Sequence, residues 1–251
     1  MVVDIKSCLV GKLIMFDGID KGGKGTACAA LRSWAESQGF KVFDLIGFQK
    51  QHGRLPEPSE LDSYDGVISG EPTYCWSGLD LREEHVKDNG RNYEANETAE
   101  LFSANRCTLY RRVLLPSLRK GLFWIQERGV VTSMVYQPVQ ARMNGKSLDL
   151  EHVKSLAGNS LAIKNPPHLL IIVHCDPKVA VKRTRVDKED DSFFERLEFL
   201  EQLAKGYHDP TLKEFFVSLG SAVLELDTSE WQPKQTCEES VALVKSVLGV
   251  L

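Results

Sequence analysis

The chain has 251 residues, of which 42% are hydrophobic and 26% are charged, a balance typical of a folded protein with a sizeable core rather than a disordered one. Its formal net charge of −4 excludes the strongly basic surface of a typical nucleic-acid-binding protein, so we expect no nucleic-acid partner. The sequence contains neither an apolar stretch of signal-peptide length at its start nor an apolar run long enough to span a bilayer, which predicts no membrane association and a cytoplasmic location.

Short apolar runs alternate with longer amphipathic stretches along the chain, which is the pattern of buried parallel strands and helices. The stretch 47–66 is predicted to be irregular, and we find no internal repeat and no linker. These features favour an α/β fold with a doubly wound parallel sheet in a single domain over 1–251. We expect strands at 12–17, 41–46, 67–69, 122–127, 168–176 and 222–227, and helices at 25–38, 97–120, 133–143, 149–158, from Pro177, at 193–206 (with a capping box between Ser192 and Glu195) and at 237–248.

The run GIDKGGKGT (18–26) stands directly between the first strand and the first helix. Three of its residues, Gly18, Gly23 and Lys24, fit the phosphate-loop pattern G-x-x-x-x-G-K. Glycines let backbone N–H groups turn inward around phosphate oxygens, and the helix N-terminus adds its partial positive charge. We therefore expect Lys24 to reach the β- and γ-phosphates of ATP as a point charge. The predicted ATP-binding residues of this loop are Gly18, Gly22, Gly23, Lys24, Gly25 and Thr26.

One position of the loop departs from the usual pattern. The Ser or Thr that normally contacts Mg²⁺ is Gly25 here, and the hydroxyl comes one residue later, at Thr26. The run GKGT resembles the loop of adenylate kinases, which have the same glycine. The sequence therefore still predicts ATP binding with Mg²⁺, with Thr26 as a candidate metal ligand.

An ordered series of motifs resembles the thymidylate kinase family of P-loop nucleoside monophosphate kinases. The run LFSANR (101–106) is similar to that family's base-binding helix almost letter for letter. The resemblance implies a P-loop kinase fold, transfer of a phosphoryl group from ATP to dTMP to give dTDP, Mg²⁺ as cofactor, and a homodimer. The other matching runs are FDGIDKGGKGT (16–26), GEPT (70–73), IQERGVVTSMVYQ (125–137), CDPKVAVKRTR (175–185) and FFERLEFLEQLAKGY (193–207).

Four residues are candidates for recognising the nucleoside. Phe102 and Arg106 are four residues apart on a predicted helix and therefore share a face. The resemblance implies that Phe102 stacks on thymine and that Arg106 contacts its O4. It also implies that Ser133 contacts the base and that Tyr136 crowds C2′ against ribose. For Tyr136, packing in the core is an equally good interpretation.

Five residues are candidates for the phosphates and the sugar. Glu127 and Arg128 end a buried strand, where ligands of open α/β sheets bind. We expect Arg128 to clamp the acceptor phosphate, and Glu127 either to hold Mg²⁺ through water or to act as a base if the acceptor is a hydroxyl. The resemblance implies that Asp20 binds the 3′-hydroxyl of the deoxyribose and places Glu71 in a turn beside the substrate. Lys21 either touches the transferring phosphate or is simply solvated. The predicted catalytic residues are Lys24, Arg128, Glu127 and Lys21.

The segment 182–192 is polar and highly charged. A charge run is usually a solvated face, but the resemblance implies a basic lid here, with Arg183 and Arg185 meeting the phosphates of ATP on closure. Such a lid excludes water and stabilises charge on the transferring group.

The stretch 47–66 is longer than a usual connection. Thymidylate kinases typically run straight from the second strand into the turn that is Glu71-Pro72 here, so we interpret 47–66 as an insertion beside the acceptor site. Tyr74 and Trp76, which follow that turn, either line the pocket or cover the inserted segment. Because the insertion borders the acceptor site, the sequence leaves open whether dTMP, dUMP or a modified pyrimidine is the preferred acceptor.

Two alternative functions stay open at this point. The family usually has Asp where this chain has Glu127, and a Glu-Arg pair is instead what deoxynucleoside kinases carry there, which would make the acceptor a 5′-hydroxyl. Gly25 and Gly129 both replace groups that the family usually keeps, so a nucleotide-binding protein with little catalysis is the third interpretation.

Overall fold

A six-stranded parallel sheet forms the centre of the protein in a computed structural model that describes residues 5–87, 89–91, 93–184 and 197–249. The strand order is β2-β3-β4-β1-β5-β6, and every neighbouring pair is parallel. The expected fold class is thus confirmed. The strands are β1 Leu13–Gly18, β2 Val42–Asp44, β3 Gly66–Gly70, β4 Phe123–Glu127, β5 Leu169–His174 and β6 Ala222–Asp227.

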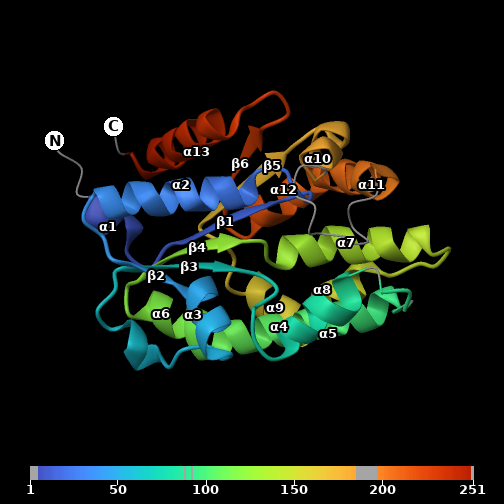
Figure 1. The fold of residues 1–251 in the computed structure, drawn as a ribbon, viewed down its shortest axis with the longest axis horizontal. Coiled ribbons are helices and arrows are strands. Elements are labelled where there is room, and N and C mark those ends of the chain that lie inside the picture. Colours follow the sequence, from blue (N-terminus) through green and yellow to red (C-terminus); the bar gives the residue numbers. More distant parts are fainter. Residues whose placement is uncertain (1–4, 88, 92, 185–196, 250–251) are drawn as a thin grey trace.

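Helices cover both faces of this sheet (Figure 1). A 3₁₀ turn, η1 (Pro58–Leu61), and two π-helical segments, η2 (Leu81–Val86) and η3 (Tyr110–Leu114), complete the described elements. The helices are α1 Ile5–Leu9, α2 Lys24–Ser37, α3 Leu45–His52, α4 Ser77–Asp80, α5 Ala95–Leu109, α6 Leu115–Arg119, α7 Val130–Met143, α8 Leu150–Ser155, α9 Ala157–Ile163, α10 Pro177–Thr184, α11 Leu197–Tyr207, α12 Pro210–Ser218 and α13 Pro233–Leu248.

The central strand β1 shows why the sheet is wound on both sides. Successive side chains of a strand point to opposite faces. Leu13 and Met15 therefore pack into the apolar cluster that includes residues of α5, α7 and α11, whereas Ile14 and Phe16 pack into the cluster under α2 and α13. Figure 1 shows α2 and α13 side by side above the sheet, opposite α5 and α7. All six residues of β1 are buried, as a strand covered on both faces requires.

The topology brings two candidate segments together at the carboxyl edge of the sheet. The chain leaves β1 for the far edge at β2, and β4 returns beside β1, with Phe16 opposite Glu127 in the register. Such a switch in strand order opens a crevice at the carboxyl ends of the strands. The phosphate loop after β1 and the Glu127-Arg128 pair at the end of β4 therefore lie next to each other.

The structure corrects the prediction for the stretch after β2. Residues 47–66 are not irregular, because α3 and η1 occupy much of them. The second strand ends early because Asp44 caps α3, its side chain accepting a hydrogen bond from the backbone N–H of Gly47 at 2.9 Å. The predicted helix 97–120 is divided into α5, η3 and α6.

Besides α3, three helices were missed from the sequence, namely α1, α4 and α12, and the predicted helix 149–158 is divided between α8 and α9. The expected capping pair of Ser192 and Glu195 lies outside the described residues, and the described helix there begins at Leu197. Among the described helices, none combines the length and the apolar character that a membrane crossing requires.

Candidate active site

The phosphate loop connects β1 to α2 in the conformation that its glycines require. Gly18 has φ +150°, and a Cβ there would lie 2.2 Å from the carbonyl oxygen of Val173 on β5. Gly23 precedes α2 with φ +95°, in the left-handed region that favours glycine. A side chain at either position would push the loop off the neighbouring strand or strain its backbone, so the glycines set the path of the loop.

Lys24 is buried at the first position of α2, inside the curve of the loop. Its Nζ donates a hydrogen bond to the carbonyl oxygen of Ile19 at 2.5 Å. Burial, together with the positive charge of Arg128, lowers the pKa of Lys24 from its ordinary 10.5 to about 8, although Asp20 and Glu127 oppose this shift. A bound phosphate would place a negative charge beside this ammonium and stabilise its protonated form.

Arg128 follows β4 and points at Asp20 in the phosphate loop. Its Nη2 forms an ion pair with Oδ1 of Asp20, and the Tyr136 hydroxyl donates to the other carboxylate oxygen, Oδ2, at 3.0 Å. The guanidinium carbon lies 5.2 Å from the centre of the Tyr136 ring. Burial is the largest influence on the pKa of Arg128 and acts to lower it, but Asp20, Tyr136, Tyr207 and Asp17 together outweigh burial, so the net direction is upward. Arg128 is therefore a fixed, permanently charged group.

Two cavities meet at this edge of the sheet. One has a volume of about 290 Å³ and the other about 720 Å³. Lys21, Lys24 and Glu127 line both of them. We call the first the acceptor cavity; it is lined by Asp20, Lys21, Lys24, Glu71, Pro72, Arg82, Val86, Phe102, Glu127, Arg128, Thr132, Tyr136 and Gln137. We call the second the donor cavity; it is lined by Lys21, Gly23, Lys24, Gly25, Thr26, Glu127, Val179, Arg183, Ser229, Glu230, Trp231, Gln232, Pro233 and Thr236.

The carboxylate of Glu127 lies against the glycine that replaces the usual hydroxyl residue. A Cβ on Gly25 would lie 3.2 Å from Oε2 of Glu127. Oxygen ligands of this kind suit Mg²⁺, which keeps several waters and binds few protein groups directly. The described residues contain no cluster of three or more His, Cys, Asp or Glu side chains able to hold a metal. Glu127 and the nearby Thr26 hydroxyl in the donor cavity therefore fit a magnesium ion held largely by phosphates and water.

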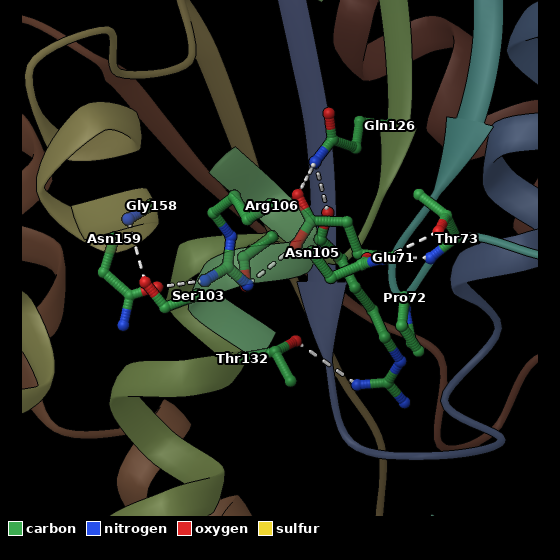
Figure 2. Close-up of polar contacts among 12 residues, drawn as sticks. Glu71, Pro72, Thr73, Ser103, Asn105, Arg106, Gln126, Thr132, Gly158 and Asn159 are labelled. Carbon is green, nitrogen blue, oxygen red and sulfur yellow. Dashed lines mark hydrogen bonds and ion pairs between the residues drawn. The ribbon is translucent and has the colours of Figure 1, made fainter. Parts of the chain in front are cut away.

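Arg106 belongs to a buried network of hydrogen bonds and an ion pair (Figure 2), and it does not line the acceptor cavity. Its Nη2 pairs with Oε2 of Glu71 at 2.7 Å and donates to the carbonyl oxygen of Gly129 at 2.9 Å. Its Nη1 bonds to Oδ1 of Asn159 on α9, and Gln126 donates to the second oxygen of Glu71 at 2.9 Å. The Nε of Arg106 has no hydrogen-bond partner among the described residues. The contact of Arg106 with a base stays a prediction.

The packing around Gly129, which replaces a group that the family usually keeps, gives a physical reason for a glycine at this position. A Cβ there would lie 2.5 Å from Cε of Met15 on β1, so any other residue would require the end of the Met15 side chain to move. Its N–H donates to the buried carboxylate of Asp17 at 3.1 Å. Asp17 also accepts a hydrogen bond from the Tyr207 hydroxyl on α11 at 2.7 Å. This departure is a packing solution within the fold and leaves Arg128 in place.

The remaining predicted residues outside the phosphate loop differ in where the structure places them. Phe102 lines the acceptor cavity, whereas Ser133 is fully buried and does not. Arg183 lines the donor cavity and donates to the carbonyl oxygen of Thr228 at 2.7 Å. Arg185 and most of the predicted lid, from residue 185 onward, lie outside the described residues.

Several lining residues were missed from the sequence. Gln137 is almost completely buried, and its Oε1 has no hydrogen-bond partner in the described part of the chain. It follows Ser133 by four residues on α7, so helical spacing from that predicted residue could have identified it. Arg82 and Trp231 carry no comparable signal, because only the tertiary fold brings them to the two cavities.

Comparison with known proteins identifies the family. The model of the thymidylate kinase family matches residues 62–221. The chain belongs to the thymidylate kinase family. A thymidylate kinase of Kosmotoga olearia is 27% identical over 77% of this chain and 79% of its own length. A probable thymidylate kinase of Pyrococcus abyssi is 28% identical over 95% of this chain and 98% of its own, and a thymidylate kinase of Thermosipho melanesiensis is 28% identical over 83% and 89%, respectively.

Proposed function

We propose that this thymidylate kinase family member transfers the γ-phosphoryl group of ATP to dTMP and produces dTDP and ADP. The observation that carries the proposal is the meeting of the two cavities at Lys21, Lys24 and Glu127. One cavity follows the phosphate loop and the other ends at Phe102, a ring on which a base can stack. A phosphoryl group at the junction would lie within reach of both cavities.

On the donor side, the loop N–H groups and Lys24 would hold the β- and γ-phosphates. Although burial lowers the pKa of Lys24 to about 8, the side chain is still mostly protonated at neutral pH and would meet the phosphates as an ammonium. Arg183 would add a second positive charge in the donor cavity, and Arg185 belongs to the same proposed lid over 182–192.

On the acceptor side, Arg128 would clamp the phosphate of dTMP. Its ion pair with Asp20 and its position over the Tyr136 ring hold the guanidinium before substrate arrives, and pre-organised charge is the main source of rate in phosphoryl transfer. Asp20 would also accept the 3′-hydroxyl of the deoxyribose, and Phe102 would stack on the base. Ser133 and Arg106 would contact the base only after the rearrangement of buried side chains.

Glu127 and Thr26 would hold Mg²⁺ on the donor side, mainly through water. When bound, such an ion would neutralise negative charge that develops on the phosphates. The protein's own contribution is to keep the Glu127 carboxylate against Gly25, at the junction of the cavities.

The deoxynucleoside kinase alternative is not favoured, because the family match is to thymidylate kinases and covers 62–221, a span that includes both Phe102 and Glu127. The third interpretation, a nucleotide-binding protein with little catalysis, was based on Gly25 and Gly129, and the structure offers another explanation for both glycines. Gly25 leaves room for Glu127, and Gly129 leaves room for Met15, so neither glycine needs a lost activity to explain it.

The decisive experiment measures ADP release from ATP and Mg²⁺ with dTMP, dUMP, dCMP, AMP, GMP or thymidine as acceptor. We expect turnover on dTMP that is abolished by Lys24→Ala and by Arg128→Ala and unchanged by Arg112→Ala, a surface arginine outside both cavities. Turnover on thymidine but not on dTMP would instead support the nucleoside kinase. Binding of nucleotide without any product would support the third alternative.

We also infer a homodimer and a cytoplasmic location from the family resemblance. Light scattering of the purified protein tests the first, since a monomer mass at micromolar concentration would contradict it. The extra elements between β2 and β3 are, on the same grounds, an insertion within one domain.

A further inference from the structure

Arg128 has a backbone conformation that residues other than glycine rarely adopt. Its φ is +65°, in the left-handed region that favours glycine. Two hydrogen bonds hold this backbone: the N–H of Arg128 donates to the carbonyl oxygen of Phe16 at 2.8 Å, and the Gln126 side chain donates to the carbonyl oxygen of Arg128 at 2.9 Å. Such a conformation persists only where the surrounding structure holds it in place. The direction of the Arg128 side chain therefore depends on the contacts of the turn to which it belongs.

The turn after Arg128 enters helix α7 without a capping side chain of its own, because the N-cap residue is Gly129. Asp17, on β1, supplies the cap instead. Its Oδ2 accepts hydrogen bonds from the backbone N–H groups of Gly129 and Thr132, both at 3.1 Å. Thr132 is the third residue of α7, where a capping side chain normally binds, and a negative charge is favourable at a helix N-terminus. Asp17 thus caps α7 from the neighbouring strand.

The other carboxylate oxygen of Asp17, Oδ1, accepts three further hydrogen bonds. The donors are the N–H of Gly18 at 2.9 Å, the hydroxyl of Thr132 at 2.7 Å and the hydroxyl of Tyr207, on α11, at 2.7 Å. Asp17 is fully buried, and a buried carboxylate is stable only where several donors compensate its charge. The Thr132 hydroxyl also accepts a hydrogen bond from Nη1 of Arg128 at 3.4 Å. One buried carboxylate therefore joins the turn, the phosphate loop and α11.

Asp17 does not belong to the described residues that line the acceptor and donor cavities, whereas Arg128 and Thr132 line the acceptor cavity. An effect of Asp17 on a bound acceptor would thus pass through the turn that the carboxylate holds. Small displacements of a group that binds the reacting part of a substrate are costly, so the contacts that fix the turn matter for binding.

We propose that Asp17 is a positioning residue for the acceptor phosphate. Its carboxylate holds residues 128–132 so that the Arg128 guanidinium faces the phosphate, and Tyr207 orients this carboxylate from α11. The inference rests on the proposed function and deepens it, because it names the group that sets the direction of the phosphate-binding arginine. Asp17 itself does not contact substrate.

The test measures the binding of dTMP and, separately, of ATP with Mg²⁺ by calorimetry. Asp17→Asn keeps the size of the side chain but removes its charge and replaces one acceptor oxygen with a donor. We expect dTMP binding to weaken by about 10- to 100-fold. ATP binding should weaken by no more than about threefold, because only the Gly18 N–H among these donors belongs to the phosphate loop.

The matched control is Asp149→Asn. Asp149 caps α8 with its side chain and lines neither cavity, so this change should alter neither affinity.

A double variant shows whether Asp17 acts through Arg128. In Arg128→Ala the group to be positioned is gone, so adding Asp17→Asn should weaken dTMP binding by less than about twofold more. A further loss of about 10-fold in the double variant would contradict the proposal, since independent effects add.

Tyr207→Phe provides a second test if thermal melts show that Asp17→Asn does not fold. It removes one hydrogen bond to the carboxylate, so dTMP affinity should fall roughly 3- to 10-fold while ATP affinity is unchanged. Parallel losses of dTMP and ATP affinity in the folded variants, or no loss of either, would overturn the proposal. Failure of the wild-type protein to bind dTMP or to phosphorylate it would overturn the proposed function itself, and this inference with it.

Discussion

Gly25 and Glu127 are far apart in sequence, but a Cβ on Gly25 would lie only 3.2 Å from Oε2 of Glu127. Each departs from what the sequence pattern leads one to expect: a hydroxyl residue is missing from the phosphate loop, and a longer acid stands at the end of β4. The structure makes them one feature. The absent side chain leaves the space that the longer carboxylate occupies, at the junction of the donor and acceptor cavities.

The first prediction follows from this contact. Gly25→Ser would force the Glu127 carboxylate to shift, and we expect kcat to fall roughly 3- to 10-fold, since small displacements at a reacting centre are costly. The Mg²⁺ concentration for half-maximal rate should rise as well. Combining Gly25→Ser with the shorter Glu127→Asp should recover part of the loss, so that the two changes are not additive. Additive effects in a magnesium titration of the four proteins would show that the two residues act separately.

The second prediction concerns the ion pair between Asp20 and Arg128. Asp20→Asn keeps the size of the side chain but removes the charge that holds the guanidinium, so we expect kcat/KM for dTMP to fall by about 10- to 100-fold. Tyr136→Phe removes a single hydrogen bond to Asp20 and should cost less. Asp62→Asn, a change at an exposed ion pair with Lys120, is the control and should leave the rate unchanged. A normal rate for Asp20→Asn would mean that Arg128 needs no carboxylate to orient it.

A third prediction addresses the close packing of α5 and α9. A Cβ on Gly158 would lie 1.8 Å from the carbonyl oxygen of Ser103, so the helices can approach only because this residue is glycine. Gly158→Ala should lower the free energy of unfolding by about 2 kcal/mol or more. Ala157→Ser changes the exposed neighbouring position and should stay within about 0.5 kcal/mol. Chemical denaturation of the two variants provides the measurement, and equal stability would contradict the packing argument.

The fourth prediction is a pH dependence of stability. Burial, and next the neighbouring His208, lower the pKa of His174, against the opposing effect of Glu225 and Asp227. Below about pH 6.5 the unfolded chain takes up a proton at His174 that the folded protein resists. The contribution of His174 to the free energy of unfolding should therefore be complete above about pH 6.5. It should decrease as the pH falls from there through the lowered pKa of the folded protein.

His174→Gln should flatten this part of the pH profile, whereas His152→Gln, at an exposed histidine of α8, should not. Denaturation curves between pH 5 and 8 test the difference. If wild type and His174→Gln lose stability in parallel over this range, another group is responsible for the loss.

Local patterns allowed much of the fold to be predicted. Each of the six strands lies within or beside its predicted run, because buried parallel strands are short apolar segments that are readable one at a time. The phosphate loop was readable for the same reason, since its glycines and Lys24 are neighbours in the chain. The missed helices α3 and α12 were within reach as well, because Asp44 and Asp209 cap them.

What the sequence by itself determined was therefore the six strands, the longer helices, the loop and the family to which the chain belongs. Only the tertiary structure decided which side chains meet, because contacts between distant segments depend on strand order and helix packing rather than on local pattern. It placed Glu127 against Gly25, paired Arg106 with Glu71, and brought Arg82 to the acceptor cavity. A buried charged side chain is stable only beside a compensating charge or polar group. The position of that partner in the folded protein cannot be read from the spacing of residues along the chain.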